Sequence, residues 1–369
     1  MSAAEFKRFN VDVVVFLREY WQQRPFLIRG AIPDFVPPID ADTLAGLAME
    51  DAIESRIVGF DQGCWTLEQG PFKADDFQRG HPWTLLVQGV DQWLPEVATL
   101  RDCVDFLPRW RFDDVMVSYA VDGGGVGPHF DRYDVFLLQG EGQRLWRIGP
   151  YCDDSTPRLE HDSLHLLAEF ETVEEYLLNP GDALYIPPGY AHWGVAQGDC
   201  TTFSLGFRAP TLADLSDRLL ESVVERLAPA LLLEDQNSIT GTERPGEISQ
   251  LQIENARNAV INAVQALDDG SWLGNLVSET KAPLEELNQS PLAQQLVIDP
   301  ACRVLWMEKS SQIEVFCDGE SLLVDKTVLP ALLTLLCSEP MITDSAGTAM
   351  RPLLEFLWAR GALFDLEAL

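Results

Sequence analysis

The spacing of apolar residues constrains the fold of this 369-residue chain more than any other feature. Between residues 115 and 207 the chain consists of short β-branched and aromatic runs, separated by Gly, Pro or Asn. These runs read VMVSYAV, YDVFLLQ, RLWRIG, DALYIPP and TTFSLGF. Such a rhythm is typical of an all-β barrel or sandwich. We therefore predict a mainly β domain over residues 1–210, with the first 110 residues as its lead-in.

Beyond residue 210 the apolar residues recur at steps of three and four, which is the period of amphipathic helices. One such face runs from Leu212 to Leu227 and a second from Ile253 to Leu267. The polar stretch 235–247 between them contains Gly and Pro and suits a connecting loop. We predict a helical region over 211–295. It either packs on the barrel or forms a dimer interface, and its heptad-like spacing favours a homodimer.

The last segment, 296–369, mixes short strand-like runs with two helix-like runs, as in a small α+β winged-helix domain. Winged helices often bind DNA. This segment, however, has eleven acidic residues against five basic ones, and the whole chain carries a formal charge of -32. Such a field repels phosphate backbones and attracts basic proteins. We expect a basic protein partner and no direct contact with nucleic acid. Solubility alone, or a salt-tolerant organism, is the alternative explanation of the charge.

No stretch of the chain has the roughly 18 uncharged apolar residues that span a bilayer. The N-terminus also lacks the apolar core of a signal peptide. The seven cysteines are widely spaced and never form a C-x-x-C pair, so we expect reduced thiols. We therefore expect a cytoplasmic protein that does not contact a membrane.

Two segments far apart in the sequence carry candidate metal ligands. In GGGVGPHFD, His129 and Asp131 are two residues apart, which places both side chains on one face of an extended segment. In PPGYAH, His192 follows a strand and a rigid turn. Two imidazoles and one carboxylate form the facial triad that binds Fe(II) and leaves positions open for a 2-oxoacid and dioxygen. Each element alone is more often structural, so the prediction depends on their combination.

Arg144 is the candidate anchor for the distal carboxylate of a 2-oxoacid. It lies on the predicted strand RLWRIG, which follows DVFLLQ through the turn 140–142. We expect these two strands to form a hairpin, with Arg144 near the His129 segment. A guanidinium can hold a carboxylate through two hydrogen bonds. A solvent-facing position for Arg144 is the alternative.

The predicted strand DDVMVSYAV places Asp114, Met116 and Ser118 on one face. Ser118 could bond the cosubstrate carboxylate. Asp114 could pair with a cationic substrate side chain beside Tyr133, although a salt bridge at the edge of the barrel explains Asp114 equally well. His161 and His165, four residues apart, are a weaker candidate for a second metal site.

These residues closely resemble the bacterial ribosomal oxygenases, a JmjC-type family of 2-oxoglutarate oxygenases. The resemblance rests on MVSYAVDGGGVGPHFDRYDVFLLQGEGQRLWRIG, NPGDALYIPPGYAHWG and FSLGFRAP, with the lead-in YWQQRPFLIRGAI. It covers about residues 15–210. The order of the following regions also fits the family, in which a dimerisation region precedes a winged-helix domain. Generic cupins share only the Gly-Asp and Pro-x-Gly-x-x-His portion.

The resemblance implies a double-stranded β-helix that uses Fe(II), 2-oxoglutarate and dioxygen to hydroxylate an arginine of a basic large-subunit ribosomal protein. It implies iron ligands at His129, Asp131 and His192, and a 2-oxoglutarate cation at Arg144. It implies a substrate-arginine pocket at Asp114, Met116, Tyr133 and Ser204. Other members hydroxylate a histidine of a different ribosomal protein, and the acidic Asp114 favours arginine here. A non-catalytic JmjC scaffold that binds ribosomal protein and a cupin with another metal are the rival hypotheses.

Overall fold

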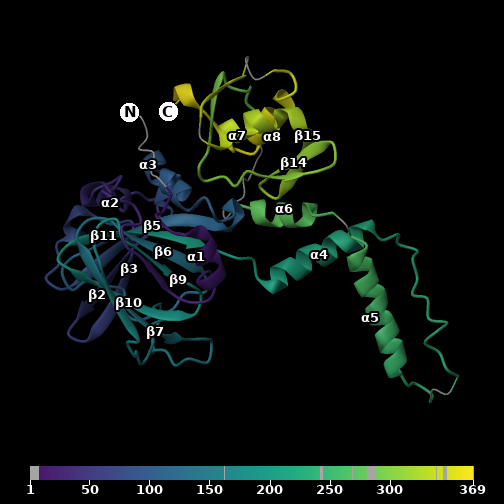
Figure 1. The fold of residues 1–369 in the computed structure, drawn as a ribbon, viewed down its shortest axis with the longest axis horizontal. Helices are drawn as coiled ribbons and strands as arrows, with labels where there is room; N and C mark the ends of the chain where they lie inside the picture. The colour runs from purple at the N-terminus through teal and green to yellow at the C-terminus, as the bar shows by residue number, and fades with distance from the viewer. Residues whose placement is uncertain are drawn as a thin grey trace. The chain divides into compact units, whose positions relative to one another are not determined.

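The computed structural model divides the chain into two compact units, residues 1–209 and 210–369 (Figure 1). The ranges that it describes are 8–161, 163–241, 244–267, 269–280, 288–337, 339–343 and 347–368. Each unit has its own buried apolar core.

The first unit is built around two antiparallel sheets (Figure 1). The larger has the strand order β1-β9-β6-β11-β5-β4-β2-β3. Its strands are β1 (Phe26–Ile28), β2 (Ser55–Asp61), β3 (Cys64–Gln69), β4 (Trp83–Val87), β5 (Phe112–Ala120), β6 (Asp134–Gln139), β9 (Ala183–Ile186) and β11 (Cys200–Phe207). The smaller has the order β10-β7-β8, with β7 (Gln143–Tyr151), β8 (Glu174–Leu178) and β10 (Tyr190–Gln197). The predicted β class is therefore confirmed, although β8 and β10 were not predicted.

The predicted hairpin between β6 and β7 is wrong. β6 pairs with β9 and β11 in the large sheet, whereas β7 pairs with β8 and β10 in the small one. Every residue of β6 is buried, so this strand needs a neighbour on each side and cover on both faces. β7 alternates between half-buried and buried residues over its first six positions, as expected of a strand with one face on the core. The chain thus changes sheets at residues 140–142, as it does again between β9, β10 and β11.

Short helices and an aromatic core close one end of the large sheet. The α-helices are α1 (Val13–Glu19), α2 (Ala41–Leu47) and α3 (Pro95–Ala98), and the 3₁₀ turns are η1 (Ala74–Phe77), η2 (Val90–Gln92), η3 (Thr99–Val104) and η4 (Arg109–Arg111). Phe16 of α1 packs edge-on against the ring of Tyr185 on β9, with 5.0 Å between centroids. The Tyr185 hydroxyl donates to the buried Asp134 carboxylate, which also accepts from Arg111. The lead-in is therefore an integral part of the barrel core.

The second unit combines a helical segment with a small α+β assembly (Figure 1). Its helices are α4 (Leu212–Arg226), α5 (Gln250–Gln265), α6 (Ser271–Ser278), α7 (Leu329–Leu336) and α8 (Arg351–Ala359). Its strands form the sheets β16-β12-β17 and β13-β14-β15. These strands are β12 (Gln295–Ile298), β13 (Leu305–Glu308), β14 (Gln312–Cys317), β15 (Glu320–Asp325), β16 (Met341–Ile342) and β17 (Leu363–Asp365), and the 3₁₀ turns are η5 (Lys326–Val328) and η7 (Leu366–Ala368). Both predicted amphipathic helices are present, whereas α6 and the sheet around β12 were not predicted.

The cysteines carry free thiols, and Cys103, Cys152, Cys200 and Cys317 are buried. Among the described helices, none is both long enough and apolar enough to cross a membrane.

Asp91 in η2 supports β5 from behind, because its carboxylate accepts a hydrogen bond of 2.7 Å from the Val115 backbone N–H. Burial, reinforced by the nearby Asp114, raises the pKa of Asp91 to about 7. The folded protein therefore binds a proton more tightly than the unfolded chain does. Its stability should fall as pH rises from about 4 to 7, while the carboxyl group loses that proton.

Asp91→Asn should therefore be more stable than the wild type at pH 8, by roughly 2 kcal/mol, and nearly equal to it at pH 4.5. The amide oxygen can still accept from Val115, so the bond is kept and only the buried charge is removed. Urea unfolding at the two pH values measures the difference. Asp61→Asn, at an exposed position in β2, is the control. A pH-independent difference for Asp91→Asn would contradict the explanation.

Candidate active site

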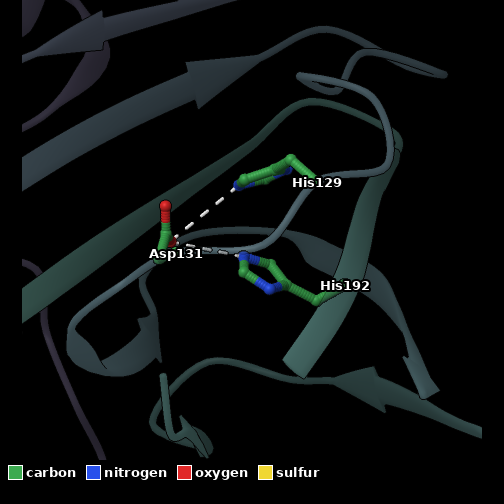
Figure 2. Close-up of side chains that lie close together, drawn as sticks. All are labelled: His129, Asp131 and His192. Atoms are coloured by element: carbon green, nitrogen blue, oxygen red, sulfur yellow. Dashed lines mark ion pairs between the residues drawn. The ribbon is translucent and has the colours of Figure 1, made fainter. Parts of the chain in front are cut away.

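Three predicted ligands converge inside the first unit: His129, Asp131 and His192 point toward one another (Figure 2). One donor atom from each lies within 4.8 Å of the other two. The Asp131 carboxylate is 4.0 Å from Nε2 of His129 and 3.6 Å from Nε2 of His192. Among the described residues, this is the only His, Cys, Asp and Glu cluster compact enough to hold a metal ion.

Backbone hydrogen bonds lock the two ligand segments together. His129 and His192 exchange N–H to carbonyl bonds of 3.1 and 2.8 Å, which form an isolated β-bridge. The Gly189 N–H donates to the Asp131 carbonyl oxygen at 2.8 Å. Gly189 has φ of +83°, a left-handed conformation that glycine adopts without strain. The Pro-Pro-Gly turn therefore fixes the distance between segments 60 residues apart.

Each histidine is oriented through its other ring nitrogen. Nδ1 of His129 lies 2.9 Å from the Gly127 carbonyl oxygen, and Nδ1 of His192 lies 2.9 Å from that of Tyr190. A carbonyl oxygen can only accept, so Nδ1 carries the proton and Nε2 presents a lone pair toward Asp131. Burial, together with the neighbouring His129, lowers the pKa of His192 to about 4. Its ring is therefore neutral at physiological pH, as a metal ligand must be.

The glycine run before His129 lies along the edge of β10. The Ala196 N–H donates to the Gly124 carbonyl, and the Gly123 N–H donates to the Ala196 carbonyl. A Cβ on Gly125 would lie 2.4 Å from the Gly194 carbonyl oxygen, so this approach requires glycine. The glycine run therefore allows the close approach of this segment to the β10 backbone.

A cavity of about 340 Å³ opens beside the three ligands. All but one of the predicted site residues line it. Its walls are Arg56, Val58, Leu67, Gln69, Leu86, Met116, Ser118, Val126, His129, Phe130, Asp131, Tyr133, Val135, Leu137, Arg144, Trp146, Ser163, Leu164, His165, Leu166, His192 and Ser204.

Arg144 lies in this wall with only 4% of its surface exposed. Its Nη1 lies 3.4 Å from the Ser118 hydroxyl, whereas Nε and Nη2 have no hydrogen-bond partner. A buried guanidinium with two unpartnered nitrogens is costly unless an anion completes it. The site therefore suits a ligand carboxylate. Arg147 lies on the opposite face of β7 and pairs with Glu175, as the period of two predicts.

The predicted substrate residues divide into two sets. Met116, Tyr133 and Ser204 line the cavity. Asp114 lies outside its lining, although the residue is buried, and its carboxylate accepts a 2.6 Å hydrogen bond from Gln88. The strand period predicted a shared face for Asp114, Met116 and Ser118, but no pattern indicated that Gln88 would reach Asp114.

Several cavity residues were not singled out from the sequence. Arg56 and Gln69 are directly paired on β2 and β3, in a region read only as a lead-in. Ser163, Leu164 and Leu166 come from the long β7–β8 connection and carry no recognisable motif, whereas their neighbour His165 was singled out only as a weak metal-site candidate. Trp146 could have been predicted from the sequence, because it lies two residues from Arg144 and therefore shares the same face of β7.

The alternative of a second metal site at His161 and His165 finds no support in the described residues. Nδ1 of His161 accepts hydrogen bonds from the N–H groups of Ser163 and Leu164, and its Nε2 lies 3.3 Å from the Trp65 carbonyl oxygen. His165 instead lines the cavity. His161 thus orders the segment that contributes to the cavity wall.

Comparison with known proteins identifies this architecture. Residues 99–215 match the JmjC domain family. Over 344 residues, the chain is 33% identical to the Escherichia coli ribosomal protein uL16 3-hydroxylase, covering 91% of each chain. This chain belongs to the JmjC ribosomal oxygenases. Within the family it is also 43% identical, over 211 residues, to a probable ribosomal oxygenase of Haemophilus influenzae, covering 56% of this chain and 52% of the relative.

Solved ribosomal oxygenase structures agree with this assignment over nearly the whole chain. The X-ray structure of E. coli ycfD superposes with a TM-score of 0.83 at 30% identity, covering 98% of this chain and 100% of that chain. YcfD in complex with cobalt and 2-oxoglutarate gives a TM-score of 0.79 at 30% identity, covering 97% and 99%. The resemblance seen in the sequence is confirmed.

Proposed function

We propose that this chain is an Fe(II)- and 2-oxoglutarate-dependent protein hydroxylase that acts on an arginine of a basic large-subunit ribosomal protein. The observation that carries the proposal is one cavity that joins a His-Asp-His cluster to a buried, partly unsatisfied arginine. The relative named as a uL16 hydroxylase and the YcfD complex with cobalt and 2-oxoglutarate support the same chemistry.

The donor set fits ferrous iron. Two imidazoles and one carboxylate lie on one side of a common point and leave the cavity side open. His129, Asp131 and His192 would hold the metal. When bound, iron supplies the redox chemistry by which dioxygen and 2-oxoglutarate give carbon dioxide, succinate and a hydroxyl group on an unactivated carbon. The carbonyl oxygens of Gly127 and Tyr190 hold the imidazoles in the ligating tautomer throughout.

The chain's own residues also set the position of the cosubstrate. Arg144 provides the cation for the distal carboxylate of 2-oxoglutarate, and Ser118 lies within reach of the same guanidinium. Leu137 and Trp146 form apolar wall beside it. Such a wall excludes water, which strengthens the ion pair between arginine and carboxylate.

The remaining cavity wall is available for a protein side chain. Met116, Tyr133 and Ser204 face this space, and the buried Asp114 adds negative charge behind it. A carboxylate favours a guanidinium over a neutral imidazole, so we assign the substrate residue as arginine. The net charge of -32 favours a basic protein as the partner and disfavours a direct complex with nucleic acid.

Mass spectrometry tests this function. The protein is incubated with Fe(II), 2-oxoglutarate and individual basic ribosomal proteins, and each product is searched for one added oxygen. We expect a single hydroxylated arginine in one large-subunit protein, with succinate formed in equal amount. Oxygen on a histidine would instead assign the alternative specificity. Binding of a ribosomal protein without any decarboxylation would indicate a scaffold.

We propose further that residues 1–210, 211–295 and 296–369 are an oxygenase domain, a dimerisation region and a winged-helix-like domain. A ribosomal protein substrate also implies a cytoplasmic enzyme. Exposed apolar side chains on α4 support the dimer: Leu220 and Val224 lie on one face, with Val224 67% exposed, and the exposed Leu227 directly follows the helix. Water-exposed apolar stripes of this kind usually mark an interface.

Light scattering after gel filtration should give twice the monomer mass for the wild type. Leu220→Glu combined with Val224→Glu should shift the protein to monomers, because charged residues would interrupt the apolar stripe. Glu221→Gln with Glu225→Gln, on the same helix, is the matched control and should remain dimeric. A monomeric wild type would reject the interface.

A further inference from the structure

Three buried side-chain nitrogens without a hydrogen-bond partner lie on one face of β7. Two belong to Arg144 (Nε and Nη2), and the third is Nε1 of Trp146. Among the described residues, these are the only buried side-chain polar atoms in the cavity wall that lack a hydrogen bond. Buried donors are normally satisfied, so this pair of side chains indicates a ligand that accepts from both.

Strand register places Trp146 between the arginine and the metal-site histidines. On β10 the residue opposite Arg144 is Ala196, that opposite Trp146 is Gly194, and that opposite Ile148 is His192. The indole centroid is 6.0 Å from the His192 ring centroid and 5.8 Å from the Arg144 guanidinium carbon. A 2-oxoacid that extends from the metal ligands to Arg144 therefore passes Trp146.

Gly194 fixes the way in which the indole lies. A Cβ at position 194 would come within 2.8 Å of Cη2 and Cζ3 on the six-membered ring. The face of the six-membered ring of Trp146 thus packs against the β10 backbone, where only glycine leaves room. Nε1 belongs to the five-membered ring and is not among the atoms nearest to this position.

The number of donors matches the capacity of one carboxylate. An ionised carboxylate accepts about four hydrogen bonds. Nε and Nη2 of Arg144 can supply two, the Ser118 hydroxyl a third, and Nε1 of Trp146 a fourth. The hydroxyl proton of Ser118 is available because its oxygen accepts from Nη1 of Arg144.

We propose that Trp146 binds 2-oxoglutarate directly, by donating its indole N–H to the same distal carboxylate that Arg144 anchors. This assignment rests on the proposed function, because it requires 2-oxoglutarate to occupy this cavity. Trp146 is thereby a cosubstrate-binding residue as well as a core side chain.

Trp146→Phe tests the bond, because phenylalanine keeps an aromatic ring against Gly194 and lacks the N–H. Isothermal titration of the manganese-loaded protein under nitrogen gives the Kd for 2-oxoglutarate without turnover. We expect the Kd to rise by about 10- to 100-fold, as is typical when a hydrogen bond to a charged group is lost. The matched control is Trp193→Phe. Trp193 lies on the other face of β10, meets Phe170 edge to face and has the Arg147 guanidinium over its ring, so the Kd of Trp193→Phe for 2-oxoglutarate should change less than twofold.

A shorter ligand identifies the acceptor. 2-Oxobutanoate keeps the 2-oxoacid group but lacks the distal carboxylate, so Trp146→Phe and the wild type should bind it equally. An equal affinity of both proteins for 2-oxoglutarate would overturn the proposal. A loss of affinity that persists undiminished with 2-oxobutanoate would overturn it as well, because the effect would then lie at the metal end.

The wild-type protein provides an independent measurement if Trp146→Phe does not fold. With ¹⁵N-labelled tryptophan, one of the ten indole N–H signals of the zinc-loaded protein should move downfield when 2-oxoglutarate is added. No downfield shift of any indole signal would overturn the proposal. Failure of the proposed function looks different, because the metal-loaded wild type would then bind no 2-oxoglutarate at all.

Discussion

Asp131→Ala is expected to lower the rate of 2-oxoglutarate decarboxylation by on the order of a thousand-fold, since metal-centred charge stabilisation amounts to several kcal/mol. Asp131 supplies the only carboxylate of the cluster, and its oxygen lies within 4.0 Å of both imidazole Nε2 atoms. Without it, two neutral ligands remain and the affinity for a divalent cation falls. Succinate release, followed with and without a ribosomal protein substrate, measures the loss.

Asp154→Ala is the matched control for this change. Asp154 is an exposed carboxylate on the same unit that pairs with Arg132, next to Asp131 in the sequence. The Asp154→Ala variant should decarboxylate 2-oxoglutarate at the wild-type rate. Manganese titration should show weakened metal binding in Asp131→Ala alone, and circular dichroism should show that both variants fold. Residual activity above a tenth of the wild-type value would mean that Asp131 is not a ligand.

The metal cluster was predictable because short-range geometry determines most of it. A spacing of two residues brings His129 and Asp131 onto one side of an extended segment, and the Pro-Pro-Gly turn directs the chain toward His192. What the sequence could not supply was the reciprocal bridge between the two histidines. That bridge depends on the pairing of segments 60 residues apart.

The topology around the cluster was less predictable, and the failed β6–β7 hairpin shows why. A two-glycine turn between two apolar strands is compatible with a hairpin and with a step between sheets. The choice depends on burial of both faces of β6, which only the surrounding strands reveal. Arg56 and Gln69 reach the cavity for the same reason: sheet order, not local pattern, brings β2 and β3 to this wall.

Arg144→Ala is expected to raise the KM for 2-oxoglutarate by about 10²- to 10³-fold, as is usual when one member of a buried charge pair is removed. The KM of Arg144→Lys should lie between those of the wild type and Arg144→Ala, because an ammonium keeps the charge but lacks the planar fork of the guanidinium. Initial rates at varied 2-oxoglutarate concentration measure both. Arg147→Ala, three residues along β7 and paired with Glu175, should be unaffected. An unchanged KM for Arg144→Ala would favour a cupin that uses a different ligand.

The same arginine should reduce the stability of the protein when 2-oxoglutarate is absent. Its guanidinium is buried, and within the described chain its Nε and Nη2 atoms have no hydrogen-bond partner. Methionine has a similar length and no charge. Arg144→Met should therefore raise the free energy of unfolding of the ligand-free protein by about 1 to 3 kcal/mol. Urea unfolding with and without 2-oxoglutarate measures this effect.

Saturating 2-oxoglutarate should stabilise only the wild type, because a ligand stabilises the state that binds it. The order of stability of the two metal-loaded proteins should then reverse as 2-oxoglutarate is added. If Arg144→Met were less stable than the wild type at every 2-oxoglutarate concentration, the guanidinium would be stabilising the fold. A reversal would show that Arg144 is retained for binding at the expense of stability, as expected of a functional residue in an otherwise apolar wall.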